Sequence, residues 1–143
     1  MASYRTTIES HLAPVEAFAY MADFANARHW EPSVGDARRE GDGEVGLGST
    51  FHVVARFGGR DVALRYVIAS FDAPRLVVLE ADRPGFVSRD TITIEPSATG
   101  SLVHYDARLV FKGLGRIFDP LAQRVFNGVG AKATAGLRVA LNP

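Results

Sequence analysis

An acidic side chain lies in the apolar phase of a segment that alternates like a β-strand. In the expected strand from Phe86 to Glu95, Asp90 and Ser88 share their phase with Ile92 and Ile94. Alternate residues of a strand point to the same face of a sheet, so Asp90 is predicted to face the apolar interior. Because loss of water raises the pKa of a carboxyl group, Asp90 is the candidate catalytic acid or base of this chain.

The same position of Asp90 allows three other roles. Its carboxylate could accept a hydrogen bond that anchors a ligand. It could also form an ion pair with Arg83 or Arg89 if a β-bulge shifts the phase of the strand so that the arginine points inward. As a third alternative, Asp90 could lie at a solvent-accessible end of the strand, where water solvates its charge. The sequence leaves these alternatives open.

Two tyrosines occupy inward phases of other expected strands. Tyr66 lies in the apolar phase of the segment from Asp61 to Phe71, and Tyr105 lies in the apolar phase of the segment from Leu102 to Lys112. A tyrosine has an apolar ring and a polar hydroxyl, so both residues suit the orientation of a ligand as well as core packing. In a catalytic site, Asp90 would transfer the proton and a tyrosine would orient a carbonyl or hydroxyl group.

The outer phase of the last expected strand carries His104, Asp106 and Arg108, and Ser101 lies nearby. The nucleophile, base and orienting group of a catalytic triad must converge within hydrogen-bond reach, whereas these four residues follow one another along a single extended segment. The sequence therefore predicts a solvated polar face, which offers contacts to a protein partner of unknown identity.

The glycines of one loop and the four histidines are further candidates for a cofactor site and a metal site. Gly41, Gly43 and Gly46 fit Gly-x-Gly-x-x-Gly, but the chain continues into a strand rather than into a helix that would bind a pyrophosphate. The histidines lie at positions 11, 29, 52 and 104, which is not a spacing typical of metal ligands. We therefore expect neither a cofactor nor a bound metal.

The composition excludes several classes of function. The 16 basic and 16 acidic residues give a formal net charge of zero, which favours neither nucleic acid nor an anionic membrane as a partner. The chain has no cysteine, so disulfides and thiolate metal sites are excluded. Its apolar runs are short and its first residues lack the features of a signal peptide, so we expect a soluble cytoplasmic protein with no stable membrane insertion.

The order of elements indicates a single domain that spans residues 1–143, and a chain of 143 residues is long enough to form one hydrophobic core. Alternation predicts a first strand from Ser3 to Ser10, and two short helices follow between Ala13 and Trp30. Short turn signals separate most of the later strands, so consecutive strands are expected to pair antiparallel. These strands are expected near Asp36 to Glu40, Ser49 to Phe57, Asp61 to Phe71, Arg75 to Ala81, Phe86 to Glu95 and Leu102 to Lys112.

The last part of the chain changes to helical spacing. Apolar residues from Phe118 to Ala140 recur along one side, which predicts one long helix. Gly128, Gly130 and Gly136 each cost about 1 kcal/mol relative to alanine inside a helix. Close packing, a break in the helix, or space left over the sheet would each explain these glycines.

The order of a strand, two short helices, antiparallel hairpins and a long final helix resembles the helix-grip fold of the START and Bet v 1-like superfamily, also called SRPBCC. Local segments resemble its polyketide cyclase/dehydrase-like branch, namely Ala13 to Glu16, Asp23 to Trp30, Val45 to Phe51, Asp72 to Leu76 and Thr91 to Pro96. The resemblance covers the whole chain and implies an α+β fold, in which a curved antiparallel sheet of about seven strands grips the final helix over an internal cavity. It implies no particular catalytic residue, because the superfamily includes aromatase/cyclases as well as lipid and hormone carriers.

The implied cavity lies between the concave sheet and the final helix, and the inward phases indicate which side chains line it. We expect these residues to be Trp30, Phe51, Val53, Leu64, Tyr66, Ser88, Asp90, Tyr105, Leu121, Val125 and Val129. Such an apolar lining favours a protein that binds or carries a hydrophobic small molecule, such as a lipid, a polyketide or an isoprenoid. A cyclase or dehydratase that uses Asp90 is the first alternative, and a ligand-responsive protein-interaction module is the second.

Overall fold

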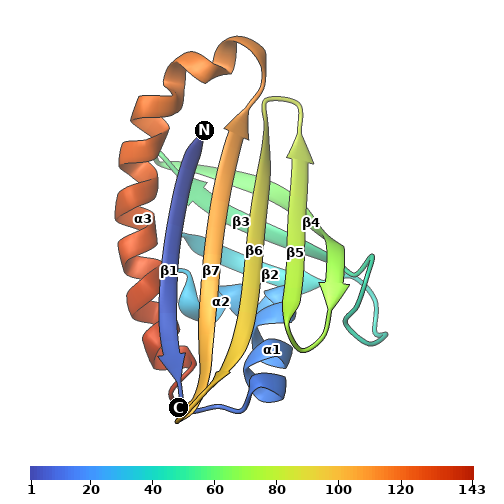
Figure 1. Ribbon diagram of the computed structural model, residues 1–143. Helices are drawn as coiled ribbons and strands as arrows, with labels where there is room; N and C mark the ends of the chain where they lie inside the picture. The colour runs from blue at the N-terminus through green and yellow to red at the C-terminus, as the bar shows by residue number, and fades with distance from the viewer.

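Turns of two or three residues join the strands from β3 (Thr50–Phe57) onward, so each of these strands pairs antiparallel with the next. The computed structural model describes residues 1–143, and its sheet has seven strands in the order β1-β7-β6-β5-β4-β3-β2 (Figure 1). The first strand pairs antiparallel with the last, a pairing that was not predicted from the sequence. The strands are β1 (Ala2–Ser10), β2 (Val34–Arg39), β3 (Thr50–Phe57), β4 (Arg60–Asp72), β5 (Leu76–Arg83), β6 (Phe86–Ser97) and β7 (Gly100–Phe111).

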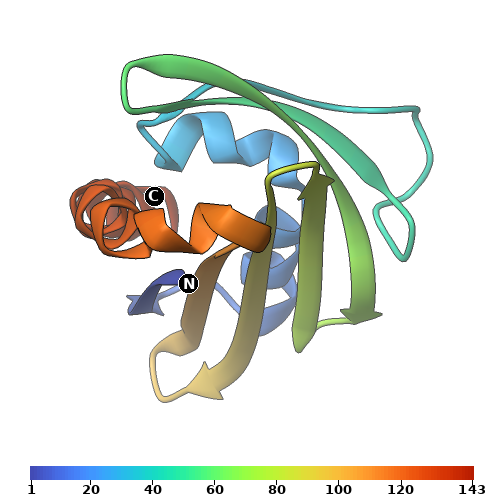
Figure 2. The same ribbon diagram turned by 90° about the horizontal axis from the view of Figure 1, so that it is seen from above.

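The helices fill the concave side of the sheet. The chain forms α1 (Pro14–Ala22), the 3-10 turn η1 (Phe24–Asn26) and α2 (Ala27–Trp30) between the first two strands, then the 3-10 segment η2 (Gly113–Phe118) and α3 (Asp119–Ala140) at its end. Viewed from above, the sheet curls around α1 and α2, and α3 lies along its open side (Figure 2). This is the α+β helix-grip architecture that the sequence predicted.

Local sequence explains where the first helices begin. Pro14 lies in the first turn of α1, where a missing N–H group breaks no helical hydrogen bond. The carboxylate of Asp23 accepts a hydrogen bond from the backbone N–H of Ala25 at 3.2 Å and so caps the next turn. These signals place Trp30 at the end of α2, facing the concave sheet, where 2 % of it is exposed.

The core lies between the concave face of the sheet and the helices. The inward phases predicted for β3, β4, β6 and β7 are confirmed, because Val53, Leu64, Ile92 and Val103 are all buried. The helices contribute further buried side chains, among them Met21, Phe24, Trp30, Ala133 and Leu137. None of the helices is both long and apolar enough to cross a membrane.

Helix α3 is unbroken from Asp119 to Ala140, so its glycines do not divide it. A Cβ atom at Gly130 would overlap the ring of Tyr4, and one at Gly136 would overlap the backbone carbonyl of Trp30. A Cβ atom at Gly128 would meet no neighbouring atom. Close packing therefore explains Gly130 and Gly136, whereas Gly128 lies beside open space.

Candidate binding pocket

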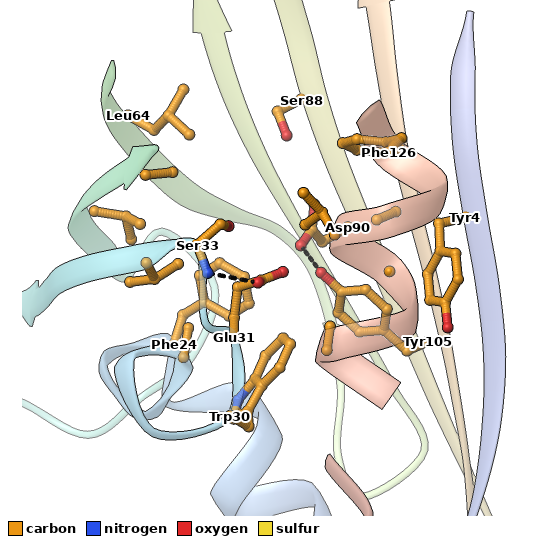
Figure 3. A pocket seen from close by; sticks show the side chains of 18 of the residues that line it. Tyr4, Phe24, Trp30, Glu31, Ser33, Leu64, Ser88, Asp90, Tyr105 and Phe126 are labelled. Atoms are coloured by element: carbon orange, nitrogen blue, oxygen red, sulfur yellow. Dashed lines mark hydrogen bonds between the residues drawn. The ribbon is translucent and has the colours of Figure 1, made fainter. Parts of the chain in front are cut away.

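A pocket lies between the concave sheet and α3, where the resemblance implied a cavity (Figure 3). Its volume is about 50 Å³, and 15 of its 20 lining residues are hydrophobic. The sheet forms one wall, α3 forms another, and the end of α2 with the residues after it forms a third. The lining residues are Tyr4, Phe24, Ala27, Trp30, Glu31, Ser33, Val34, Val53, Ala55, Phe57, Leu64, Tyr66, Ser88, Asp90, Tyr105, Ala107, Phe126, Val129, Gly130 and Ala133.

Asp90 of β6 points into this pocket and is only 3 % exposed. The hydroxyl of Tyr105 donates a hydrogen bond to its Oδ2 atom, whereas its Oδ1 atom has no hydrogen-bond partner among the protein's groups. Burial raises the pKa of Asp90 from 3.8 to about 7; the hydrogen bond from Tyr105 lowers this pKa, and the nearby carboxyl group of Glu31 raises it. Near neutral pH the side chain can therefore both take up and release a proton.

The arginines considered as partners of Asp90 lie elsewhere. Arg89 follows the outward phase of β6, and its Nη1 atom lies 3.2 Å from Oε1 of Glu80 on β5. Arg83 donates a hydrogen bond to the backbone carbonyl of Ala63. The pairing of β6 with β5 and β7 contains no bulge, so the phase of Asp90 is not shifted. The structure thus gives Asp90 no ion pair with either arginine.

A second carboxyl group, that of Glu31, also points into the pocket (Figure 3). Its Oε1 atom accepts a hydrogen bond from the backbone N–H of Ser33 at 3.0 Å, which orients the side chain. Burial raises the pKa of Glu31 above its usual value, while the hydrogen bonds from Ser33 lower it. Glu31 was not predicted from the sequence, because it lies in an extended turn with no alternating pattern. The available signal was Pro32, which favours an extended residue directly after α2.

Four aromatic side chains surround these carboxyl groups. The ring of Trp30 meets that of Tyr105 edge to face at 5.3 Å between centroids, and the ring of Phe24 meets that of Tyr66 at 4.9 Å. The hydroxyl oxygens of Tyr66 and Ser88 form a hydrogen bond of 2.8 Å. Burial raises the pKa of both tyrosines well above the usual value, so their hydroxyl groups stay protonated and can donate.

The structure brings together most of the residues selected from the sequence but not all of them. On the pocket wall lie Trp30, Val53, Leu64, Tyr66, Ser88, Asp90, Tyr105 and Val129. Phe51 points inward as expected, but it is completely buried in the core and does not reach the pocket. The lining residues that were not predicted from the sequence include Tyr4, Phe24, Glu31, Ser33 and Phe126.

The prediction that Leu121 and Val125 line the cavity is wrong. These residues are 61 % and 39 % exposed, and neither belongs to the pocket wall. Helical spacing places them on the same side as Val129, but no element packs over that side before Phe126, the first buried residue of α3. A periodic pattern gives the apolar side of a helix and does not show where along the helix a partner begins.

The outer face of β7 holds a network of polar side chains rather than a catalytic triad. The ring of His104 lies 2.9 Å from the hydroxyl of Thr7 through Nδ1 and 3.0 Å from a carboxylate oxygen of Glu95 through Nε2. Asp106 accepts hydrogen bonds from Arg5 at 2.8 Å and from Arg108 at 3.0 Å. Ser101 donates instead to the carbonyl of Leu12, so it is not a hydrogen-bond partner of His104.

The curved sheet, the long gripped helix and the apolar pocket between them define a helix-grip protein of the START and Bet v 1-like superfamily. The chain matches the family described as polyketide cyclase / dehydrase and lipid transport over residues 1–142, and it belongs to that family. A comparison with curated protein sequences finds no match.

Solved structures share this fold at low sequence identity. A START superfamily protein from Mycobacterium smegmatis is 13 % identical, with a TM-score of 0.76 over 99 % of this chain and 97 % of that chain. The protein TTHA0849 from Thermus thermophilus is 14 % identical, with a TM-score of 0.76 over 98 % of this chain and 95 % of that chain. The di-domain ARO/CYC BexL from the BE-7585A biosynthetic pathway is 9 % identical, with a TM-score of 0.70 over 97 % of this chain and 49 % of that chain.

Proposed function

We propose that this protein binds a hydrophobic small molecule in the pocket between the sheet and α3 and carries it to another site of use. The observation that supports this function is the pocket wall itself, on which 15 of 20 residues are hydrophobic while a few polar groups converge at one place. Apolar walls provide affinity, and a small number of placed polar groups orients the ligand. Membership of a family described by lipid transport agrees with this function.

The size of the pocket constrains how such a ligand enters. A volume of about 50 Å³ is well below the roughly 300–1,000 Å³ typical of pockets for drug-sized ligands. A long-chain or polycyclic molecule therefore requires part of the wall to move outward. The most weakly held part is η2 with the first turns of α3, because no residue between Gly113 and Val125 is buried.

The single tryptophan of the chain provides a direct test, since Trp30 lies on the pocket wall. A panel of straight-chain alcohols, isoprenoid alcohols and small aromatic hydrocarbons is titrated while the emission of Trp30 and the melting temperature are recorded. At least one of these classes of compound should change both the emission of Trp30 and the melting temperature in a saturable manner. Absence of any saturable response across the panel would refute the binding function.

A matched pair of variants on β7 locates the binding. Ala107→Leu places a larger side chain on the pocket wall, next to Asp90 in the register of the sheet, and should weaken binding by about 10-fold or more. Val110→Leu also enlarges a side chain of β7, by one carbon, but on the outer face, where the residue is 41 % exposed, and it should leave affinity unchanged. Equal affinity in the two variants would place the ligand outside this pocket.

A cyclase or dehydratase is the second candidate, and one observation favours it. Asp90 has a pKa near 7 and a free Oδ1 atom inside an apolar pocket, next to the hydroxyl of Tyr105. Such a carboxylate can remove a proton beside a substrate carbonyl and return it to a departing hydroxyl group.

With a poly-ketone substrate, kcat/KM should depend on a group of pKa near 7, and Asp90→Asn should lose this activity while still binding the substrate. Turnover unchanged by this substitution would remove Asp90 from any mechanism.

A further inference from the structure

The charged groups of the pocket are of one sign. Glu31 and Asp90 both line the wall, and none of the 20 lining residues is an arginine, lysine or histidine. The hydroxyls of Tyr66, Tyr105 and Ser88 are hydrogen-bonded within the protein. A ligand therefore meets two carboxyl groups that no cation of the protein neutralises inside the pocket.

The free oxygen of Asp90 defines where a ligand group would be held. Its Oδ1 atom is buried and unpartnered, although the other oxygen accepts a hydrogen bond from Tyr105. A buried acceptor without a donor is costly, and a hydrogen bond from a charged donor is stronger than one from a neutral donor. A ligand that donates a hydrogen bond at this point would remove that cost, whereas an anionic ligand would add a third like charge.

The surrounding rings favour a positive charge as well. Phe24, Trp30, Tyr66 and Tyr105 all lie on the pocket wall, and their edge-to-face contacts place them around the same space. The negative face of an aromatic ring attracts a cation within about 6 Å of its centre. Aromatic side chains together with carboxylates form an environment suited to an ammonium group, and a volume of about 50 Å³ suits such a head group better than a whole lipid.

We propose that the ligand of this pocket is an apolar molecule with a basic amine, whose ammonium group donates a hydrogen bond to Oδ1 of Asp90 and lies near the carboxylate of Glu31. This inference rests on the proposed binding function and specifies the chemical class of the ligand. Molecules with the same hydrocarbon but an anionic head, such as fatty acids, bind more weakly.

Three probes with the same hydrocarbon chain and different head groups test the inference: hexylamine, 1-hexanol and hexanoate. Their affinities are measured at pH 7.5 by isothermal titration calorimetry and by the emission of Trp30. A charge-assisted hydrogen bond predicts that the amine binds about 10-fold or more tightly than the alcohol. The carboxylate should bind more weakly than the alcohol.

Two pocket variants and one control variant assign the preference to the pocket. Asp90→Asn keeps a side chain of the same shape and should reduce the affinity for hexylamine about 10-fold, with a change of less than about 3-fold for 1-hexanol. Glu95→Gln removes a carboxylate from the outward phase of the same strand, where 58 % of the side chain is exposed, and should leave the order of the probes unchanged. Glu31→Gln provides an independent test in another segment of the chain, directly after α2. It should also reduce the affinity for hexylamine more than the affinity for 1-hexanol.

The outcomes separate the inference from the function on which it rests. Hexanoate or 1-hexanol binding as tightly as hexylamine would overturn the amine preference and leave the binding function standing. The amine preference is equally overturned if Asp90→Asn and Glu31→Gln both keep the full affinity for hexylamine. If neither these probes nor the wider panel of apolar compounds binds, the proposed function and the inference both fail.

Discussion

At the scale of single residues, the position of Asp90 in β6 determines both its burial and its chemistry. The alternation of the strand puts the carboxyl group among Ile92, Ile94 and the concave core, and this burial is the main cause of its raised pKa. The same burial leaves Oδ1 without a partner. The inward phase of Asp90 therefore has two consequences. Its carboxyl group exchanges a proton near neutral pH, and its Oδ1 atom is free to accept a hydrogen bond from a ligand.

The raised pKa of Asp90 predicts how stability depends on pH. The pKa rises from 3.8 in the unfolded chain to about 7 in the folded protein, so the folded state holds this proton more tightly. Stability from this group is therefore greatest at low pH and falls as pH rises through this range, by about 2–3 kcal/mol between pH 5 and pH 8. Asp90→Asn removes the titration, so its free energy of unfolding relative to the wild type should increase by about this amount from pH 5 to pH 8.

Urea denaturation of both proteins at several pH values measures this difference directly. The comparison is internal, because every other titrating group is common to the two proteins. A difference in the free energy of unfolding that stays constant from pH 5 to pH 8 would contradict the raised pKa. A difference that changes in the opposite direction would indicate that Asp90 is stabilised as a carboxylate.

At the scale of elements, α3 consists of a loosely held first half and a packed second half. Its buried residues are Phe126, Gly130, Ala133, Thr134 and Leu137. In the packed half, the ring of Tyr4 lies against Gly130, and its hydroxyl forms a hydrogen bond with Thr134. The burial of α3 side chains therefore begins near the middle of the helix, at Phe126, where the pocket wall also begins.

The glycines of α3 give a matched set of substitutions. Gly128→Ala adds a methyl group in open space and should stabilise the protein by up to about 1 kcal/mol, the difference in helix propensity. Gly130→Ala forces the ring of Tyr4 to move and should destabilise the protein by about 1–3 kcal/mol. In Gly136→Ala the new methyl group meets the backbone carbonyl of Trp30, which cannot move as freely as a side chain, so this variant should be destabilised at least as much. Thermal and urea unfolding of the three variants measures these changes. Equal destabilisation at Gly128 and Gly130 would contradict the packing described for α3.

At the scale of the whole molecule, alternation and turn signals were enough to predict the sheet. The strands obey a period of 2, so the inward phase of residues such as Val53, Leu64 and Tyr105 follows from the sequence alone. The pocket wall was harder to predict, because Glu31 reaches it through the path of the chain after α2. Tyr4 shares the inward phase of Ile8, but its place on the wall depends on where α3 packs against β1, at Gly130. Leu121 was misplaced for a related reason, since periodicity carries no information about where α3 leaves the sheet.

The arrangement of α3 over the open side of the sheet predicts which part of the molecule opens first. Few contacts hold the first turns of the helix: the side chain of Gln123 bonds the backbone of Ser3, and Asp119 pairs with the N-terminal amine. Amides between Asp119 and Val125 should therefore exchange with deuterium about 10-fold or more faster than those between Gly130 and Leu137.

A ligand that fills the pocket should slow exchange in the first half of α3 when this half has to move to admit it, because the bound form favours the closed position. The second half serves as the internal control, since its side chains are already buried in the core. Exchange measured by mass spectrometry with and without hexylamine compares the two halves in one experiment. Equal exchange in both halves of the free protein would show that α3 opens as a unit, and it would contradict entry of the ligand through the first half alone.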